Sequence, residues 1–300
     1  MRLASIRTPD GPRLGVGVRV DGTELVVRAD ATGVPVPATP LEFLALPEPE
    51  RARVLTAATA LAADGPSGDT VFALDDAPLG PPVATPSKII CLALNYKAHA
   101  DEGGFTAPDR PVLFLKGPHT LAGHRDDVVV PPISRRIDHE GELAVVVGRR
   151  CRHLTEDDWH TAVAGYSVLN DLTARDLQLV DIERSHPWDL SKNLDGYGPM
   201  GPWLVTPDEV PDPQALDLRV TVDGEVRQSG STAQMIFGVA ELLIRLSAVM
   251  TLEAGDIIAT GTCDGIGPVP DGSVVEVSVG DLGVLRNRVR FAPAGTEGRA

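Results

Sequence analysis

The sequence has 300 residues, is 43% hydrophobic and 23% charged, and therefore describes a globular chain of one or two domains rather than a disordered one. With 27 lysines and arginines against 42 aspartates and glutamates, the net charge of -15 is the opposite of a nucleic-acid binder's charge, so we expect no nucleic-acid partner. The same charge disfavours anionic ligands at long range, so an acidic substrate would need a local cationic pocket.

The first eighty residues are predicted to form a small α+β unit. Asp-Gly turns separate runs rich in β-branched residues, which is a strong hairpin signal, and the predicted strands cover 2–6, 14–20 and 24–29. Helices are expected at 39–46 and 49–65, the second with proline near its start and glycine just past its end.

A proline-rich stretch at 75–88 is expected to be an extended linker, with a domain boundary between units of residues 1–80 and 85–300. The second unit is dominated by apolar strands at short spacing, predicted at 88–94, 112–116, 127–132, 142–148, 163–169, 201–206, 216–224, 256–262, 274–280 and 283–291. Helices are expected at 155–164, from a threonine cap and acidic first turn, and at 236–250, from the helical spacing of its apolar residues. This pattern favours a β-rich α+β fold over alternating βαβ units.

Cysteine usage and hydropathy indicate the cellular compartment. Cys91, Cys151 and Cys263 are far apart and odd in number, so neither a zinc site nor a disulfide framework is expected, and a reducing cytoplasm fits best. The start of the chain has no apolar signal region, and no window approaches the length of a membrane span. We therefore expect a cytoplasmic protein with no membrane partner.

The stretch 137–149 is the most informative part of the sequence. Glu140 and Glu142 lie two residues apart at the start of a strongly β-type run, so a strand would place both carboxylates on one face. Neighbouring like charges repel unless a cation lies between them, and oxygen ligands favour Mg²⁺, Mn²⁺ or Ca²⁺ over zinc. A solvent-exposed strand start with two hydrated glutamates explains the same pattern.

A second cluster follows the predicted strand 163–169. Asp171 comes just after this strand, and Arg175 and Gln178 lie within the next turns of chain. A carboxylate at a strand end, followed by an arginine and an amide, is expected where a metal ligand adjoins a carboxylate-binding patch. Taken alone, these residues are also typical of an Asx turn with a surface ion pair.

His99 and Glu102 lie three residues apart and would share one face if the segment is helical. A histidine held by a carboxylate can accept a proton from water near neutral pH, whereas a solvated histidine is the simpler alternative. Two glycines follow directly, so the segment could move as a lid. Lys116 and Lys192 are further candidates for a cationic pocket.

Together these residues resemble the fumarylacetoacetate hydrolase (FAH) family, in particular its bacterial acylpyruvase and 2-hydroxyhepta-2,4-diene-1,7-dioate isomerase type. The resemblance spans about two thirds of the chain, from residue 88 to 290, and rests on eight motifs in order: LNYKAHADE, FLKGP, HEGELAVVVGR, GYSVLNDLTARDLQ, SKNLDGYGPMGPWLVT, VDGEVRQSGST, MIFGVAELL and LEAGDIIATGTCDGIGP. It implies an FAH-type catalytic domain, a mixed β-sandwich or roll. The short N-terminal unit is similar to the extra α+β domain of many bacterial members.

The resemblance also implies site residues. One Mg²⁺ or Mn²⁺, with Ca²⁺ as a further candidate, would be held at the positions of Glu140, Glu142 and Asp171. The catalytic set would be His99 and Glu102, as a lid pair that deprotonates a water, and Lys192, which would stabilise developing charge. The positions implied for substrate binding are Tyr96, Lys116, Arg175, Gln178 and Thr262.

The implied function is metal-dependent hydrolysis of the C–C bond of an acylpyruvate-like 2,4-diketo acid, by a homodimer. Decarboxylation, keto–enol isomerisation or hydration of a related keto acid would use the same site. A catalytically silent keto-acid or metal-binding protein is the alternative from another class. Ser191 and Asn193 beside Lys192, and Cys263 after Thr262, depart from the pattern of many relatives. We expect these departures to line the pocket, and Cys263 to be a packing residue rather than a nucleophile.

Overall fold

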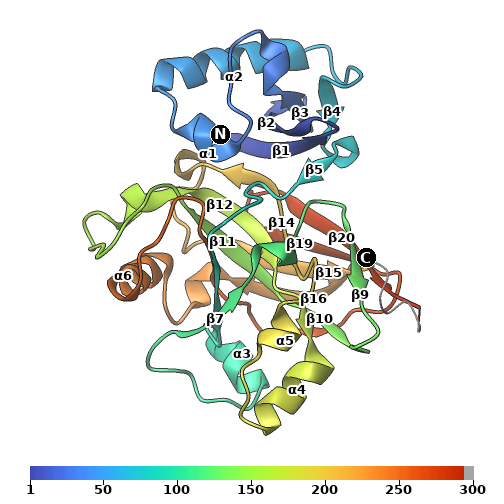
Figure 1. Cartoon of the computed structure of the whole chain (residues 1–300), viewed down its shortest axis with the longest axis vertical. Coiled ribbons are helices and arrows are strands. Elements are labelled where there is room, and N and C mark those ends of the chain that lie inside the picture. Colours follow the sequence, from blue (N-terminus) through green and yellow to red (C-terminus); the bar gives the residue numbers. More distant parts are fainter. Residues whose placement is uncertain (294–300) are drawn as a thin grey trace.

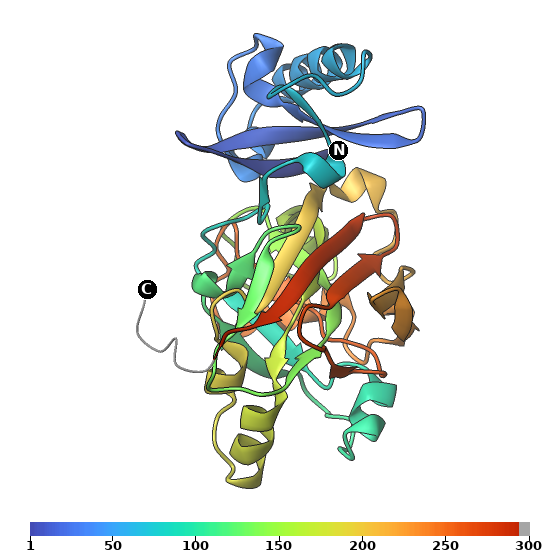
Figure 2. The same ribbon diagram turned by 90° about the vertical axis from the view of Figure 1, so that its right-hand side faces the viewer.

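The computed structural model describes residues 1–293 and shows a small unit packed on a larger, strand-rich body (Figure 1). The small unit contains an antiparallel sheet and two helices: β1 (Arg2–Thr8), β2 (Gly11–Val20), β3 (Thr23–Arg28), β4 (Val71–Ala73), α1 (Pro40–Leu44) and α2 (Glu48–Ala62). Helix α2 covers the side of this sheet that is turned away from the body (Figure 2). The predicted strands and helices of this unit are all present.

Local sequence explains the helices of the small unit. Thr39 caps α1, since its hydroxyl accepts a hydrogen bond from the Glu42 backbone N–H, and Pro40 occupies the first turn, where no N–H is needed. In α2 the residues Val54, Ala58 and Ala62 recur every four positions and are fully buried. This apolar stripe packs on the sheet of the small unit.

The sheet of the small unit continues into the body. Strand β1 pairs with β14, and the continuous sheet has the order β4-β3-β2-β1-β14-β12-β11-β17-β6-β7. Its further strands are β5 (Leu79–Gly80), β6 (Ile89–Ala93), β7 (Val112–Lys116), β8 (Leu121–Ala122), β11 (Gly141–Val147), β12 (Val163–Asn170), β14 (Gly198–Val205) and β17 (Ile257–Ala259). Whether residues 1–80 form a separate domain stays a prediction.

A second, five-stranded sheet packs against the body part of the first. Its order is β16-β15-β19-β20-β9, with β9 (Asp127–Val130), β15 (Asp217–Val222), β16 (Glu225–Ser231), β19 (Val274–Val279) and β20 (Val284–Phe291). A three-stranded ribbon joins β10 (Ile137–His139), β13 (Thr173–Ala174) and β18 (Gly267–Pro268). The remaining helices are α3 (Lys97–Glu102), α4 (Arg175–Glu183), α5 (Asp189–Lys192) and α6 (Val239–Val249).

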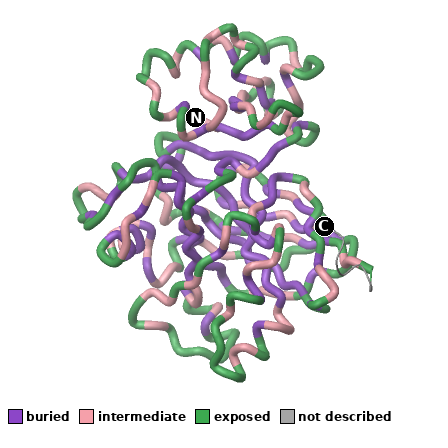
Figure 3. The backbone as a smooth tube through the Cα atoms, viewed as in Figure 1, coloured by how far each residue is buried: buried purple, intermediate pink, exposed green. Residues whose placement is uncertain are grey.

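Strand β11 is buried along its whole length, and the buried part of the chain is concentrated around it in the body (Figure 3). Leu143 and Val145 belong to the core shared with the five-stranded sheet, whereas Ala144 and Val146 belong to the core on the other face. Burial on both faces explains why 143–147 is an unbroken apolar run.

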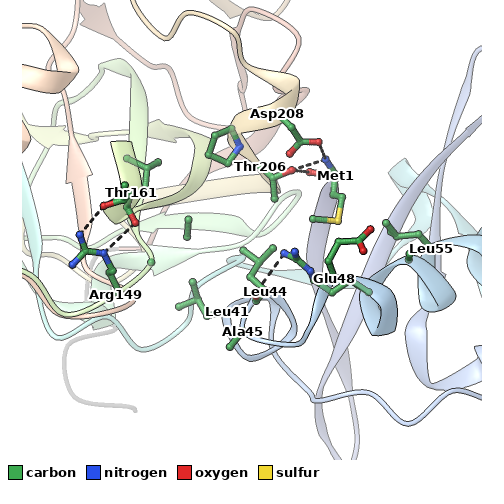
Figure 4. Close-up of a pocket in the computed structure, with 16 residues that line it drawn as sticks. Met1, Leu41, Leu44, Ala45, Glu48, Leu55, Arg149, Thr161, Thr206 and Asp208 are labelled. Atoms are coloured by element: carbon green, nitrogen blue, oxygen red, sulfur yellow. Dashed lines mark hydrogen bonds and ion pairs between the residues drawn. The ribbon is translucent and has the colours of Figure 1, made fainter. Parts of the chain in front are cut away.

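The small unit and the body meet beside the chain start (Figure 4). The Met1 ammonium group donates to the Thr206 hydroxyl (2.5 Å) and pairs with Glu209 (2.7 Å). Beside this contact lies a hollow of about 600 Å³, lined by Leu41 and Leu44 from α1 and by Arg149 from the body, among others. None of the helices within residues 1–293 has the length and apolar character that a membrane crossing requires.

Two sequence predictions need correction. The helix expected at 155–164 is wrong, because only a 3₁₀ turn at Trp159–Ala162 forms before β12 begins. The Asp158 carboxylate accepts from both the backbone N–H and the hydroxyl of Thr155, which stabilises a local turn instead of a helix start. The linker at 75–88 is also shorter than expected, since Leu79–Gly80 pairs with β1 as strand β5.

Gly141 of β11 leaves no room for a side chain between the two sheets near the site. A Cβ atom there would lie 2.4 Å from a methyl of Val220 and 2.8 Å from one of Val277. We predict that Gly141→Ala destabilises the protein by about 1–3 kcal/mol, which lowers the melting temperature by roughly 2 to 5 °C in calorimetry. Gly267→Ala, where a Cβ would meet nothing within 4 Å, is the control and should change the melting temperature little. Equal melting temperatures for the two variants would contradict this packing account.

Candidate active site

Strand register brings three acidic side chains together. Gly141 of β11 pairs with Asn170 of β12, so Glu140, just before β11, lies beside Asp171, just after β12. The Asp171 backbone N–H donates to the Glu140 carbonyl (2.8 Å), and the Glu140 N–H donates to the Asn170 side chain (3.0 Å). Because Gly141 faces the five-stranded sheet, Glu142 points to the opposite face of β11.

These three carboxylates form a compact, buried cluster. Glu140, Glu142 and Asp171 are 6%, 1% and 1% exposed, and one oxygen from each lies within 4.8 Å of the others. The alternative of two hydrated glutamates at an exposed strand start is therefore wrong.

Two of the three carboxylates have cationic partners. The Lys192 ammonium contacts Glu140 (2.9 Å) and Asp171 (2.7 Å), and Lys116 contacts the second oxygen of Asp171 (2.6 Å). Arg175 pairs with Glu140 and with Asp138. Burial alone would raise the pKa of Glu140, but the charges of Lys192 and Arg175 hold that pKa well below its usual range.

Glu142 has no cationic partner among the described residues, and the hydrogen bond its carboxylate accepts comes from the Gly261 backbone N–H (2.7 Å). Burial, together with the charges of Asp171 and Glu140, raises the pKa of Glu142 well above its usual value. A buried carboxylate held between two others is the arrangement that a divalent cation relieves.

The donor set fits such a cation. Three carboxylates offer only oxygen, which suits Mg²⁺ or Mn²⁺, and no cysteine or histidine belongs to the cluster among residues 1–293. Glu140, Glu142 and Asp171 are the residues that would hold it.

A cavity of about 770 Å³ opens beside the cluster. Of the residues expected from the sequence, those that line it are His99, Glu102, Glu140, Arg175, Gln178, Lys192 and Thr262. Tyr96, Lys116, Glu142 and Asp171 are nearly or fully buried and do not belong to its lining. Lys116 therefore contacts Asp171 from outside the cavity, and Tyr96 lines a separate pocket together with Lys97 and Asp101.

The segment with His99 and Glu102 is helical, and both residues of this helix, α3, line one side of the cavity. The shared face expected for a helical segment is therefore present. The His99 Nδ1 atom lies 3.6 Å from a Glu102 oxygen, an ion-pair distance that is longer than a hydrogen bond. Glu102 instead accepts from the Gly265 backbone N–H (3.2 Å), so α3 is fastened to the glycine-rich turn after β17. His99 Nδ1 is buried and makes no hydrogen bond.

Sequence reasoning missed several groups that position the site. Asp138 is 1% exposed and holds both Arg136 and Arg175. Gln228 accepts from the Gly141 N–H (3.1 Å) and donates to the Thr262 hydroxyl (2.8 Å). The alternation of acidic residues at Asp138, Glu140 and Glu142 was a sequence signal that Asp138 shares a strand face with the two glutamates. Gln228 comes from the other sheet, so no local pattern could place it.

The departures from the family pattern do not line the cavity. Ser191 donates to the Trp188 carbonyl (2.8 Å), and Asn193 accepts from the Gly117 N–H (2.7 Å), which ties α5 to the end of β7. Cys263 is 1% exposed, and burial raises the pKa of its thiol to about 11. It is thus a packing residue, as predicted, whereas the expectation that these positions line the pocket is wrong.

We predict that Mn²⁺ stabilises the protein and that Glu142→Gln abolishes the effect. At one hundred times its dissociation constant a ligand adds about 2.7 kcal/mol, so the melting temperature should rise by roughly 4 °C over the protein in EDTA. Without metal, Glu142→Gln should melt no lower than the wild type, because it removes an unpaired buried charge. Glu225→Gln, at an exposed position, is the control. An undiminished Mn²⁺ shift in Glu142→Gln would exclude this site.

Comparison with known proteins places these observations in a family. The model for "Fumarylacetoacetate (FAA) hydrolase C-terminal" matches residues 88–290. An uncharacterised protein of Pyrococcus abyssi is 45% identical over 204 residues, which is 68% of this chain and 90% of that protein. Oxaloacetate tautomerase YisK of Bacillus subtilis is 40% identical over 233 residues, 74% of this chain and 76% of that protein.

Solved structures extend the similarity to the whole chain. Maleylpyruvate hydrolase from Sphingobium sp. SYK-6, in complex with manganese(II) and pyruvate, has a TM-score of 0.78 and 32% identity and covers 98% of this chain and all of its own. 2-Hydroxyhepta-2,4-diene-1,7-dioate isomerase from Mycobacterium marinum has a TM-score of 0.74 and 30% identity, with full coverage of both chains. The chain, with its FAH fold and its buried acidic cluster, therefore belongs to the fumarylacetoacetate hydrolase family.

Proposed function

We propose that the protein is a divalent-metal-dependent hydrolase that cleaves the C–C bond of an acylpyruvate-like 2,4-diketo acid. The observation that carries this proposal is the buried carboxylate cluster, with Lys192, Arg175 and His99 around the same cavity. The structure of a relative with manganese(II) and pyruvate supports it, as does the family of keto-acid enzymes to which the chain belongs.

A bound cation would supply positive charge for the oxygens of a 2-keto acid and so make the neighbouring carbon more acidic. The chain's own residues would orient that acid. Arg175 and Gln178 lie three residues apart on one face of α4 and both line the cavity, so they can donate to a carboxylate. The Lys192 ammonium, which is buried, would stabilise the negative charge that develops as the bond breaks.

The cleavage itself needs a proton acceptor for water. His99 lines the cavity, and its buried Nδ1 atom lies 3.6 Å from a Glu102 oxygen. A small movement of α3 would let Glu102 accept a hydrogen bond from Nδ1 and orient the imidazole, so that Nε2 would accept the proton of the water. The water oxygen would form a bond to the acyl carbonyl carbon, and the bond from this carbon to the methylene carbon would break. Its electron pair would remain on the methylene carbon, which takes a proton to become the methyl group of pyruvate. The products balance as one carboxylic acid and one pyruvate.

Keto–enol tautomerisation is the second candidate. The 3.6 Å gap between His99 and Glu102 favours it, because a proton transfer on the keto acid requires no activated water. The 40% identity to an oxaloacetate tautomerase adds weight. Both reactions use the same charge stabilisation at Lys192, so the role of His99 separates them.

We predict that the Mn²⁺-loaded protein converts acetylpyruvate to acetate and pyruvate and that EDTA removes the activity. Lys192→Met should lower kcat/KM by about 100-fold or more, the usual effect of losing a group that stabilises developing negative charge. Pyruvate release, followed in a coupled assay, is the measurement. Lys97→Met, an exposed lysine outside the cavity, is the matched control and should retain activity. Full activity in EDTA would contradict the proposal.

A further prediction concerns His99. If its imidazole activates water, His99→Gln should lower acetylpyruvate hydrolysis by about 10²- to 10⁴-fold, yet leave the tautomerisation of oxaloacetate within threefold of wild type. Enol absorbance and pyruvate release report the two reactions separately. His160→Gln, an exposed histidine on the 3₁₀ turn before β12, is the control. Hydrolysis that survives His99→Gln would assign the water activation to another group and would favour the tautomerase.

A further inference from the structure

The cavity beside the acidic cluster has two chemically different ends. The charged end holds Glu140, Lys192 and Arg175, and the apolar end, which is reached along β7 and α4, is formed by five side chains: Val112, Phe114, Leu179, Ile182 and Trp188. The mechanism above uses only the charged end. What the apolar end contacts determines which substrates fit.

Two elements carry the change in polarity along their length. On β7, Val112, Phe114 and Lys116 share one face, with Lys116 at the cluster and Val112 about 13 Å away along the strand. On α4, Arg175 and Gln178 lie in the first turns, whereas Leu179 and Ile182 follow on the same side of the helix and extend about 10 Å from Arg175. Both elements thus lead away from the charged end along apolar side chains.

Aromatic contacts make this change gradual rather than abrupt. The Lys192 ammonium lies 4.9 Å from the centroid of the Phe114 ring, and the Trp188 ring meets Phe114 edge-on at 6.2 Å between centroids. Phe105, just after α3, lines the cavity as well and is 41% exposed. A substrate tail that extends from Lys192 would therefore first meet aromatic rings and then aliphatic side chains.

The cationic groups of the described lining already have acidic partners. Arg136 is bound to Asp138 through two hydrogen bonds, at 2.8 and 3.0 Å. Arg175 and Lys192 are paired as described above, and His99 faces Glu102. A second carboxylate at the far end of a substrate would find no unpaired cation on this wall, and transferring it to apolar surroundings would be costly.

We infer that the substrate's tail is apolar: the protein selects 2-keto acids with an alkyl or aryl tail over dicarboxylates. This inference rests on the proposed function, because it takes the charged end to hold the keto-acid group. An apolar tail would distinguish the substrate of this chain from the dioate in the name of the similar Mycobacterium marinum isomerase, because a dioate carries a second carboxylate.

A matched pair of keto acids tests the inference by binding. 2-Oxohexanoate and 2-oxoadipate have the same number of carbons and differ only in a terminal methyl or carboxylate, and neither has the 4-keto group that cleavage requires. In calorimetry with the Mn²⁺-loaded protein, we expect 2-oxohexanoate to bind roughly tenfold more tightly than 2-oxoadipate. Equal or tighter binding of 2-oxoadipate would overturn the inference.

Variants show whether the apolar wall is responsible. Trp188→Ala should weaken the binding of 2-oxohexanoate about tenfold. The binding of pyruvate, which has no tail, should weaken less than twofold. Equal losses of affinity for both ligands would overturn the inference. Leu190→Ala is the control, because Leu190 lies on α5, the short helix that begins just after Trp188, is 71% exposed and does not line the cavity. Leu179→Lys, at a position 54% exposed, should reverse the preference toward 2-oxoadipate. If Leu179→Lys leaves the preference unchanged, the wall does not contact the tail.

The outcomes also separate this inference from the proposed function. If neither pyruvate nor the longer acids bind to the Mn²⁺-loaded protein, the keto-acid site itself is wrong and both proposals fail. If 2-oxohexanoate is preferred but no acylpyruvate is cleaved, the tail selectivity stands and the hydrolysis fails. If acetylpyruvate is cleaved and 2-oxoadipate binds more tightly, only the selectivity fails.

Discussion

Glu142 is the constraint on which the site depends. It lies on a strand that is buried along its whole length, on the face opposite the contact between the two sheets, and no cationic group of the described residues forms an ion pair with it. A carboxylate in this position is costly to the folded protein, because it has lost its hydration and stands beside two further carboxylates. Retaining such a group makes physical sense where a cation from solution completes the charge balance.

The charge balance around the cavity explains how an acidic protein can bind an acid. Four cationic side chains around the cavity form ion pairs with carboxylates of the protein: Lys116, Arg136, Arg175 and Lys192. Their positive charges are therefore neutralised within the protein. These groups alone therefore do not form the free cationic pocket that a protein with a net charge of -15 would need to bind an acidic substrate. A divalent cation on the cluster would give the cavity a net positive charge, which only then attracts a keto acid.

Local patterns predicted much of this protein and missed what depends on distant contacts. The spacing of Glu140 and Glu142 predicted a shared face, and the position of Asp171 after a strand predicted its place at the strand's end. The helix α4 was missed, since its sequence lacks a clear cap and a continuous apolar stripe. The helix at 155–164 was wrong because one side-chain turn at Thr155 outweighed a helix-like composition. The pairing of Asp138 with Arg175 and the hydrogen bonds of Gln228 leave no periodic signal, because these partners are far apart in the sequence.

The central claim is that Glu140, Glu142 and Asp171 jointly hold the cation to which the keto acid binds. Diffraction from crystals grown with Mn²⁺ and oxalate, measured at a wavelength where manganese scatters anomalously, tests it most directly. The account predicts one strong anomalous peak about 2.0 to 2.3 Å from an oxygen of each of the three carboxylates, with oxalate completing the coordination toward Arg175 and Gln178. An anomalous peak elsewhere, or oxalate bound in the cavity without manganese at these carboxylates, would contradict it.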